Sequence, residues 1–158
     1  MKKIIRLTVV FLIIVILYAW GFTMKTEFYS VKSGKNSLRI VFISDLHNCM
    51  YGGKDQSGII KEIDNNSPDL VLFGGDVIDT QGDTENALTL MKDVSEKYPC
   101  AYSNGNHETW RDNVEEFYQD VKKIGIPILD YGDSTDFMIN NQKVSVYGVV
   151  DAYGKIMS

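Results

Sequence analysis

The chain has 158 residues, a length that suits one domain and is short for two. Hydrophobic residues make up 44% of it and aromatic residues 11%, which excludes a disordered chain. The net charge is −5, and the residues after Arg6 hold 13 of the 16 basic and all 21 acidic side chains. Because a nucleic-acid-binding surface needs clustered Lys and Arg, this balance disfavours one and favours a site that collects divalent cations.

The first expected element is an uncharged apolar run at residues 7–24, preceded by three basic residues. A helix of that length rises about 27 Å, close to the roughly 30 Å of a bilayer core, so we expect one transmembrane helix. The basic residues predict a single-pass protein of the cell membrane with an extracytoplasmic domain. A cleaved signal peptide is the alternative, but no small-x-small cleavage site follows the run. Residues 1–25 are interpreted as an anchor and residues 26–37 as a juxtamembrane segment.

The rest of the chain alternates short β-branched or aromatic runs with apolar residues at helical spacing. We expect, in chain order, a strand around 28–31, a turn at 33–36, a strand at 38–43, a helix at 57–65, a strand at 69–73, a helix at 84–98, a strand at 100–102, a helix at 113–124 ending at Gly125, and strands at 126–129, 136–139 and 143–149. This alternation is typical of an α/β fold with a mostly parallel sheet.

The two cysteines, Cys49 and Cys100, lack the paired spacing of a zinc finger or a redox centre. A disulfide between them is compatible with an extracytoplasmic domain. Because each adjoins an apolar strand, two small buried or half-buried thiols are the favoured interpretation.

Both histidines of the chain follow predicted strands directly, in motifs with metal-site chemistry. Ligand groups gather beyond the carboxyl ends of parallel strands, so the motifs are expected at one edge of the sheet. The three motifs are Asp45-Leu46-His47, Gly74-Gly75-Asp76 and Gly105-Asn106-His107-Glu108.

A site for two divalent ions needs oxygen and imidazole ligands and one carboxylate that can bridge the ions. Asp45 and His47 can turn toward one ion, and Asp76 is placed to bridge. Asn106 offers an amide oxygen to the second ion. His107 points at the same pocket and suits a general acid or a group that stabilises an oxyanion. Each piece alone is more often a turn former, but the order of the three motifs after successive strands favours a metal site.

The series Asp45-x-His47, Gly75-Asp76-x-x-Asp79 and Gly105-Asn106-His107-Glu108 resembles the first three blocks of the calcineurin-like metallophosphoesterases, over residues 38–151. The resemblance implies a four-layer α/β/β/α sandwich, of which this chain supplies the N-terminal half. It also implies two divalent metal ions (Mn, Fe, Zn or similar) and attack on phosphorus by a metal-bridging hydroxide. An anchor followed directly by such a domain is similar to the membrane-attached bacterial members.

The resemblance implies the ligand roles given above, with Asp76 bridging. It implies that His107 protonates the leaving group or steadies the phosphoryl oxygens, and that Asp79 orients its ring. Family members carry an isolated His and a Gly-His-x-His downstream, and neither is found in this sequence. Residues 38–158 are therefore expected to be a C-terminally incomplete domain, the N-terminal portion of a longer enzyme.

The leading hypothesis is a metal-dependent phosphoesterase that hydrolyses phosphomonoester or phosphodiester bonds as part of a longer protein. Its expected partners are a phosphorylated small-molecule or lipid-linked substrate and, through the N-terminal helix, the membrane. The alternative is a truncated, catalytically inactive, membrane-tethered metal-binding or interaction protein. A Rossmann-like nucleotide-binding module has little support, because no Gly-x-Gly-x-x-Gly follows a strand.

Overall fold

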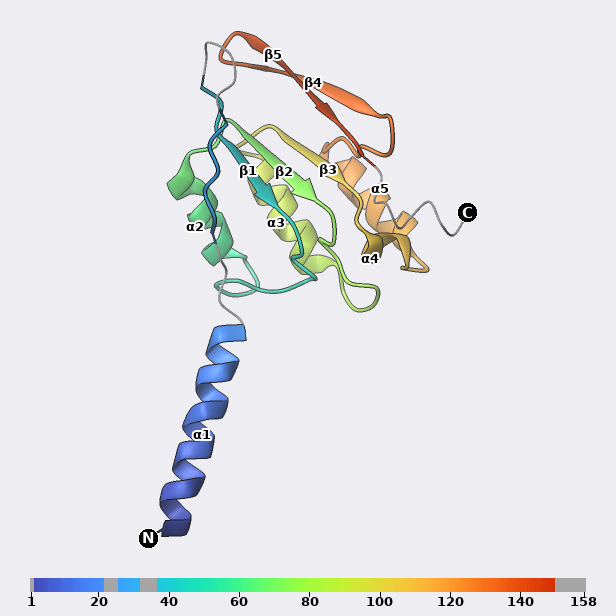
Figure 1. Ribbon diagram of the computed structural model, residues 1–158. Coiled ribbons are helices and arrows are strands. Elements are labelled where there is room, and N and C mark those ends of the chain that lie inside the picture. Colours follow the sequence, from blue (N-terminus) through green and yellow to red (C-terminus); the bar gives the residue numbers. More distant parts are fainter. Residues whose placement is uncertain (1, 22–25, 32–36, 150–158) are drawn as a thin grey trace. The chain divides into compact units, whose positions relative to one another are not determined.

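The computed structural model describes residues 2–21, 26–31 and 37–149 (Figure 1). Contacts divide the chain into two units, Met1–Ser33 and Gly34–Ser158. The first unit contains helix α1 (Lys2–Gly21), and residues 26–31 have no regular structure, so the strand expected around 28–31 was wrong. The turn expected at 33–36 lies outside the described residues.

The predicted transmembrane helix is not supported. Within the ranges described above, no helix has both the length and the apolar character needed to cross a membrane.

The second unit is built on a three-stranded parallel sheet of β1 (Ile40–Ile43), β2 (Leu70–Gly74) and β3 (Cys100–Ser103), in the order β1-β2-β3. These are the strands that the apolar runs predicted, with ends shifted by one or two residues. Helical connections make the strands parallel, so their carboxyl ends meet at one edge of the sheet (Figure 1). All three predicted metal-site motifs begin at or just beyond that edge.

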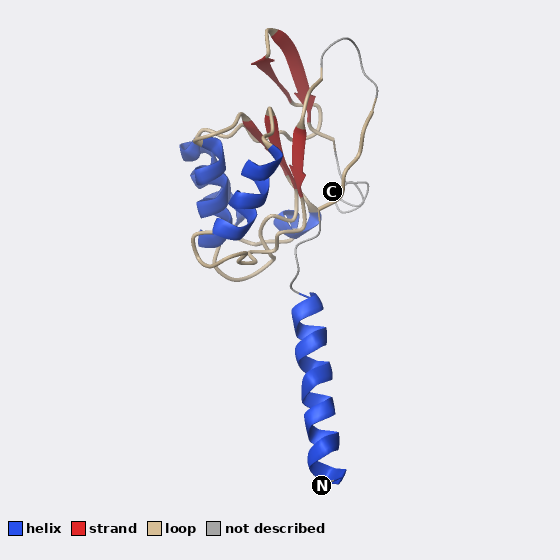
Figure 2. Ribbon diagram, turned by 90° about the vertical axis from the view of Figure 1, so that its left-hand side faces the viewer, coloured by secondary structure: helices blue, strands red, loops and turns tan. Residues whose placement is uncertain are grey.

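Three helices cover one side of this sheet (Figure 2): α2 (Ser57–Asn66), α3 (Glu85–Ser95) and α5 (Val114–Ile124). Each buries the apolar stripe that predicted it, such as Ile59 and Ile63 in α2 and Phe117 and Val121 in α5. Helix α5 ends at Gly125, whose φ of 91° is the left-handed C-cap that the sequence predicted.

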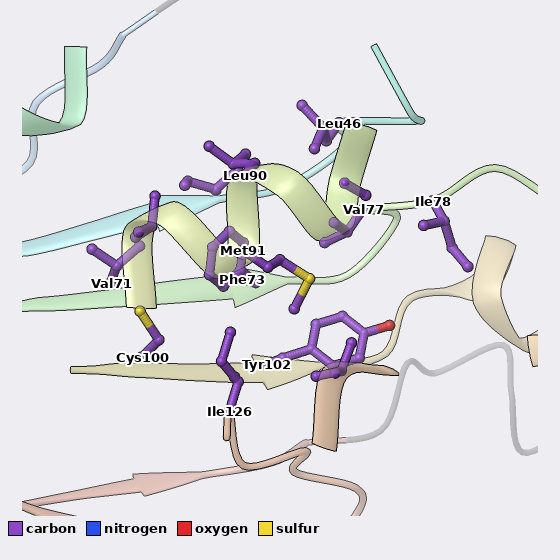
Figure 3. Close-up of a cluster of buried hydrophobic side chains, with 14 of the residues drawn as sticks. Leu46, Val71, Phe73, Val77, Ile78, Leu90, Met91, Cys100, Tyr102 and Ile126 are labelled. Carbon is purple, nitrogen blue, oxygen red and sulfur yellow. The ribbon is translucent and has the colours of Figure 1, made fainter. Parts of the chain in front are cut away.

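The core between sheet and helices continues past the strand ends and anchors the loops there (Figure 3). Phe73 in β2 is 1% exposed, and Val77 and Ile78, which follow the strand, are fully buried. Leu46, in the loop after β1, is 2% exposed. The polar residues between these anchors are therefore held at fixed positions along the sheet edge.

A separate antiparallel hairpin consists of β4 (Ser134–Ile139) and β5 (Gln142–Tyr147), joined by Asn140 and Asn141 with φ of 50° and 60°. The strand expected at 126–129 is reduced to one parallel bridge between Tyr102 and Ile128. The adjacent Pro127 has no N–H to extend a ladder.

The described residues thus form the predicted mixed α/β fold with a parallel sheet. The four-layer sandwich that the resemblance implies stays a prediction. One short helix, α4 (Asn106–Thr109), forms where only a loop was expected.

Candidate metal centre

The loop after β1 lies along the loop after β2 through three backbone hydrogen bonds. Amides of residues 45, 47 and 48 donate to carbonyls of residues 75, 76 and 77 at 3.0–3.2 Å. Asp45 and His47 adopt left-handed φ values of 55° and 47°. Because Leu46 between them is buried, the loop presents both polar side chains away from the core.

Two glycines let the loops after β2 and β3 approach each other. Gly75 has a φ of 91°, and a Cβ there would lie 2.6 Å from the Gly105 nitrogen. A Cβ on Gly105 would lie 2.5 Å from the Asp76 nitrogen and closer still to its carboxylate. No side chain fits at either position, so the small residues set the spacing of the two loops.

The contact between these loops assembles a compact donor group. One side-chain donor atom each from His47, Asp76 and His107 lies within 4.8 Å of the others. The two imidazole rings have centroids 4.4 Å apart, and Asp76 Oδ1 accepts the His107 backbone N–H at 2.9 Å. His47 Nδ1 is buried and has no hydrogen-bond partner among the described residues. The His47 imidazole, with its unpartnered buried nitrogen, and the Asp76 carboxylate fit a divalent cation with mixed nitrogen and oxygen ligands, and the His107 imidazole lies beside them.

His107 also contacts Asp79, the carboxylate partner that the resemblance implied. His107 Nδ1 lies 3.0 Å from Asp79 Oδ1, which also accepts the Thr80 backbone N–H at 2.7 Å. The hydrogen bond with His107, and next the one from Thr80, lowers the pKa of Asp79 below its ordinary value. A charged Asp79 therefore orients the His107 ring with Nδ1 toward it.

The other two predicted ligands lie at the margin of this group. Asp45 Oδ1 is 4.0 Å from His47 Nε2, and the Asp45 side chain is 69% exposed. Asn106, Asp45 and Asp76 line one pocket of about 360 Å³. Among the His, Cys, Asp and Glu side chains of the described residues, the structure thus gathers His47, Asp76 and His107, whereas the sequence grouped the first two with Asp45 and Asn106.

Two buried charged residues beside the donors had been given no role. The fully buried Glu108 carboxylate accepts four backbone N–H groups at 2.8–3.1 Å, those of Asp76, Val77, Ile78 and Gly105. Arg111, 9% exposed, donates to the carbonyls of Asp79 at 2.8 Å and Gly82 at 2.7 Å. Glu108 occupies the Glu position of a capping box, but the N-cap residue Gly105 has no side chain to complete the pattern, so the sequence signal is only half present. No local pattern indicates Arg111.

Comparison with known proteins gives two matches. Residues 38–157 match a family model described as calcineurin-like phosphoesterase. An uncharacterized metallophosphoesterase of Campylobacter jejuni is 35% identical over 78 residues, which cover 47% of this chain and 20% of that protein. The match therefore spans about a fifth of the length of this relative.

Proposed function

This chain belongs to the calcineurin-like phosphoesterase family, and we propose that it acts as a metal-dependent phosphoesterase on phosphomonoester or phosphodiester bonds. The family supports metal-dependent phosphoester hydrolysis. The observation that carries the proposal for this chain is the convergence of His47, Asp76 and His107 within 4.8 Å. The acidic balance of the chain is consistent with cation binding.

Each side chain has a proposed role. Divalent cations bound here would act as Lewis acids on a phosphoryl group and lower the pKa of a water molecule. His47 and Asp76 would hold a first cation, and the exposed Asp45 carboxylate beside His47 would add an oxygen ligand. Asn106 would supply an amide oxygen to a second cation, and Asp76 would serve as a ligand for it as well.

His107 is proposed as the proton donor to the leaving oxygen or as the cation that steadies the phosphoryl oxygens. Asp79 keeps the His107 ring oriented through Nδ1. His107→Gln should therefore abolish turnover but retain much of the Mn²⁺ affinity, whereas His47→Gln should lose both. If His107→Gln instead loses the metal as completely as His47→Gln, His107 is a ligand and not the acid.

The proposed substrate is a phosphorylated small molecule or a lipid-linked phosphate. The pocket shared by Asp45, Asp76 and Asn106 supports this proposal, because its volume of about 360 Å³ falls in the range of small-molecule sites.

The test measures Mn²⁺-dependent hydrolysis of p-nitrophenyl phosphate and bis-p-nitrophenyl phosphate by the chain. We expect turnover in the wild type and in the control Asp112→Ala, which removes an exposed acid. Asp76→Ala should lower the rate at least about a hundredfold, because it removes the shared ligand. Equal rates in Asp76→Ala and the wild type would refute the proposed role of the site.

A catalytically inactive metal-binding protein is the second candidate. The small number of donors favours this candidate, because among the His, Cys, Asp and Glu side chains in the described ranges, a group of three meets within 4.8 Å. Calorimetry that shows one bound Mn²⁺, together with no hydrolysis of either substrate, would establish this candidate over the enzyme.

A further inference from the structure

The segment that carries His107 also holds the loop after β2 at both of its ends. The Glu108 carboxylate accepts hydrogen bonds from the backbone N–H groups of residues 76, 77 and 78 at the start of the loop. Arg111, three residues after Glu108, donates hydrogen bonds to the backbone carbonyls of residues 79 and 82 farther along the loop. The Glu108 carboxylate thus accepts hydrogen bonds from the backbone N–H groups of this loop, and the Arg111 guanidinium donates hydrogen bonds to its backbone carbonyls. The loop has no regular secondary structure that would satisfy these backbone groups.

Both charged groups are buried and hydrogen-bonded. Burying a charge is costly unless hydrogen bonds satisfy it, and here Glu108 has four donors while Arg111 has three acceptors, including Asn113 Oδ1 at 3.1 Å. Val77 and Ile78 are fully buried (Figure 3). Water therefore cannot readily replace the Glu108 oxygens at their amides. Loss of the carboxylate would leave buried N–H groups without partners.

The held loop carries the two carboxylates that meet His107. Asp76 Oδ1 bonds the His107 backbone N–H, and Asp79 Oδ1 contacts its ring. Asp76 has a φ of 49°, a conformation that is unfavourable for a non-glycine residue and has to be maintained by its surroundings. The Glu108 bond to the Asp76 nitrogen is one of the contacts that maintain it.

We propose that Glu108 and Arg111 are positioning residues that act as one backbone clamp. By fixing the loop of residues 76–82, they set Asp76 and Asp79 against His107 and so preform the cation-binding group. The proposal deepens the proposed function and rests on it only for the identity of the bound group, a divalent cation.

The test is Glu108→Gln, which keeps the size of the side chain but replaces one acceptor oxygen by an N–H donor group. Trp110 serves as a fluorescence reporter of added Mn²⁺, because its ring centroid lies 5.6 Å from that of His107. The sequence has one other tryptophan, Trp20, which is replaced by Phe in every variant so that Trp110 alone gives the signal. We expect Mn²⁺ affinity to fall about tenfold or more in Glu108→Gln. The control Glu96→Gln removes an exposed charge and should bind as the wild type does.

Amide hydrogen exchange gives a second readout. In Glu108→Gln, exchange should accelerate at residues 76–78 while residues 71–73 in β2 keep their protection. Affinities are compared well below the unfolding temperatures, because a purely structural role would lower those temperatures without changing the affinity of the folded protein. Unchanged affinity and unchanged exchange would overturn the clamp. If the wild type binds no Mn²⁺, the proposed function fails, and the exchange data still decide the clamp.

Arg111→Lys covers the case in which Glu108→Gln does not fold. Lys keeps the charge but lacks the planar fork that reaches two carbonyls at once. We expect weaker Mn²⁺ binding and faster exchange at residues 79–82 in this variant. Wild-type values for both would exclude Arg111 from the clamp.

Discussion

Gly105→Ala tests whether the two donor loops have to touch. The added Cβ would lie 2.5 Å from the Asp76 nitrogen, whereas ordinary contacts begin at 3.4 Å. The loops would therefore have to separate by about 1 Å, enough to break the 2.9 Å bond between the His107 N–H and Asp76 Oδ1. Such overpacking typically costs about 1–3 kcal/mol of stability, and a 1 Å displacement can cost about a hundredfold in rate.

Mn²⁺ titration, p-nitrophenyl phosphate hydrolysis and thermal unfolding measure these effects on one preparation. We expect the Mn²⁺ affinity to fall at least about tenfold. The contact between the two loops positions the metal-binding side chains, and loss of such supporting contacts typically weakens metal binding by this amount. Gly132→Ala is the matched control: its φ is 83°, but no atom lies within 4 Å of the added Cβ. It should lose about 1 kcal/mol of stability and keep its Mn²⁺ affinity. Wild-type binding by Gly105→Ala would refute the argument from loop contact.

Three further predictions concern the fold. Burial raises the pKa of the Cys100 thiol to about 12. At pH 8 a disulfide reagent should therefore label only the half-buried Cys49 in the folded chain and should label both thiols in urea. Labelling of both thiols in the folded chain would contradict this prediction. Hydrogen bonds from Lys97 and then Tyr98 lower the pKa of Asp64. These bonds therefore stabilise the fold above the ordinary Asp pKa near 4, and this stabilisation is lost as the pH falls through the lower pKa of the folded state. In urea unfolding, Lys97→Met should lose less stability on acidification than the wild type, and an identical profile would exclude the effect. Phe73→Ala should cost about 3–5 kcal/mol in urea unfolding, because Phe73 is 1% exposed in the core; a loss below 1 kcal/mol would show that the site collapses around the deletion.

Apolar periodicity predicted the elements that bury an apolar face. The stripe of Ile59 and Ile63 placed α2 to within one residue, because those side chains pack on the sheet. The apolar residues at 28–31 failed as a strand, since Phe28 is 80% exposed and pairs with nothing among the described residues. Periodicity cannot reveal a helix of four residues, and α4 was missed for that reason.

The donor group was only partly predictable for a different reason. The predicted ends of the strands indicated which residues lie at the edge of the sheet, but they did not indicate the backbone conformation of each loop. The left-handed backbone at Asp45 and His47 turns the two side chains to different exposures, with Asp45 at the surface and His47 half-buried. Arg111 contacts carbonyls about 30 positions earlier, and a single sequence carries no sign of such a pair.

The Glu108 hydrogen bonds to residues 76–78 join parts of the chain 30 to 32 positions apart. On the ribosome, the amides of residues 76–78 are made first and lack their native acceptor until Glu108 has left the exit tunnel. β1, α2 and β2 can form before then, but the cation donors cannot take their final places. The donors on both sides of this contact can therefore reach their final arrangement only after α4 has emerged.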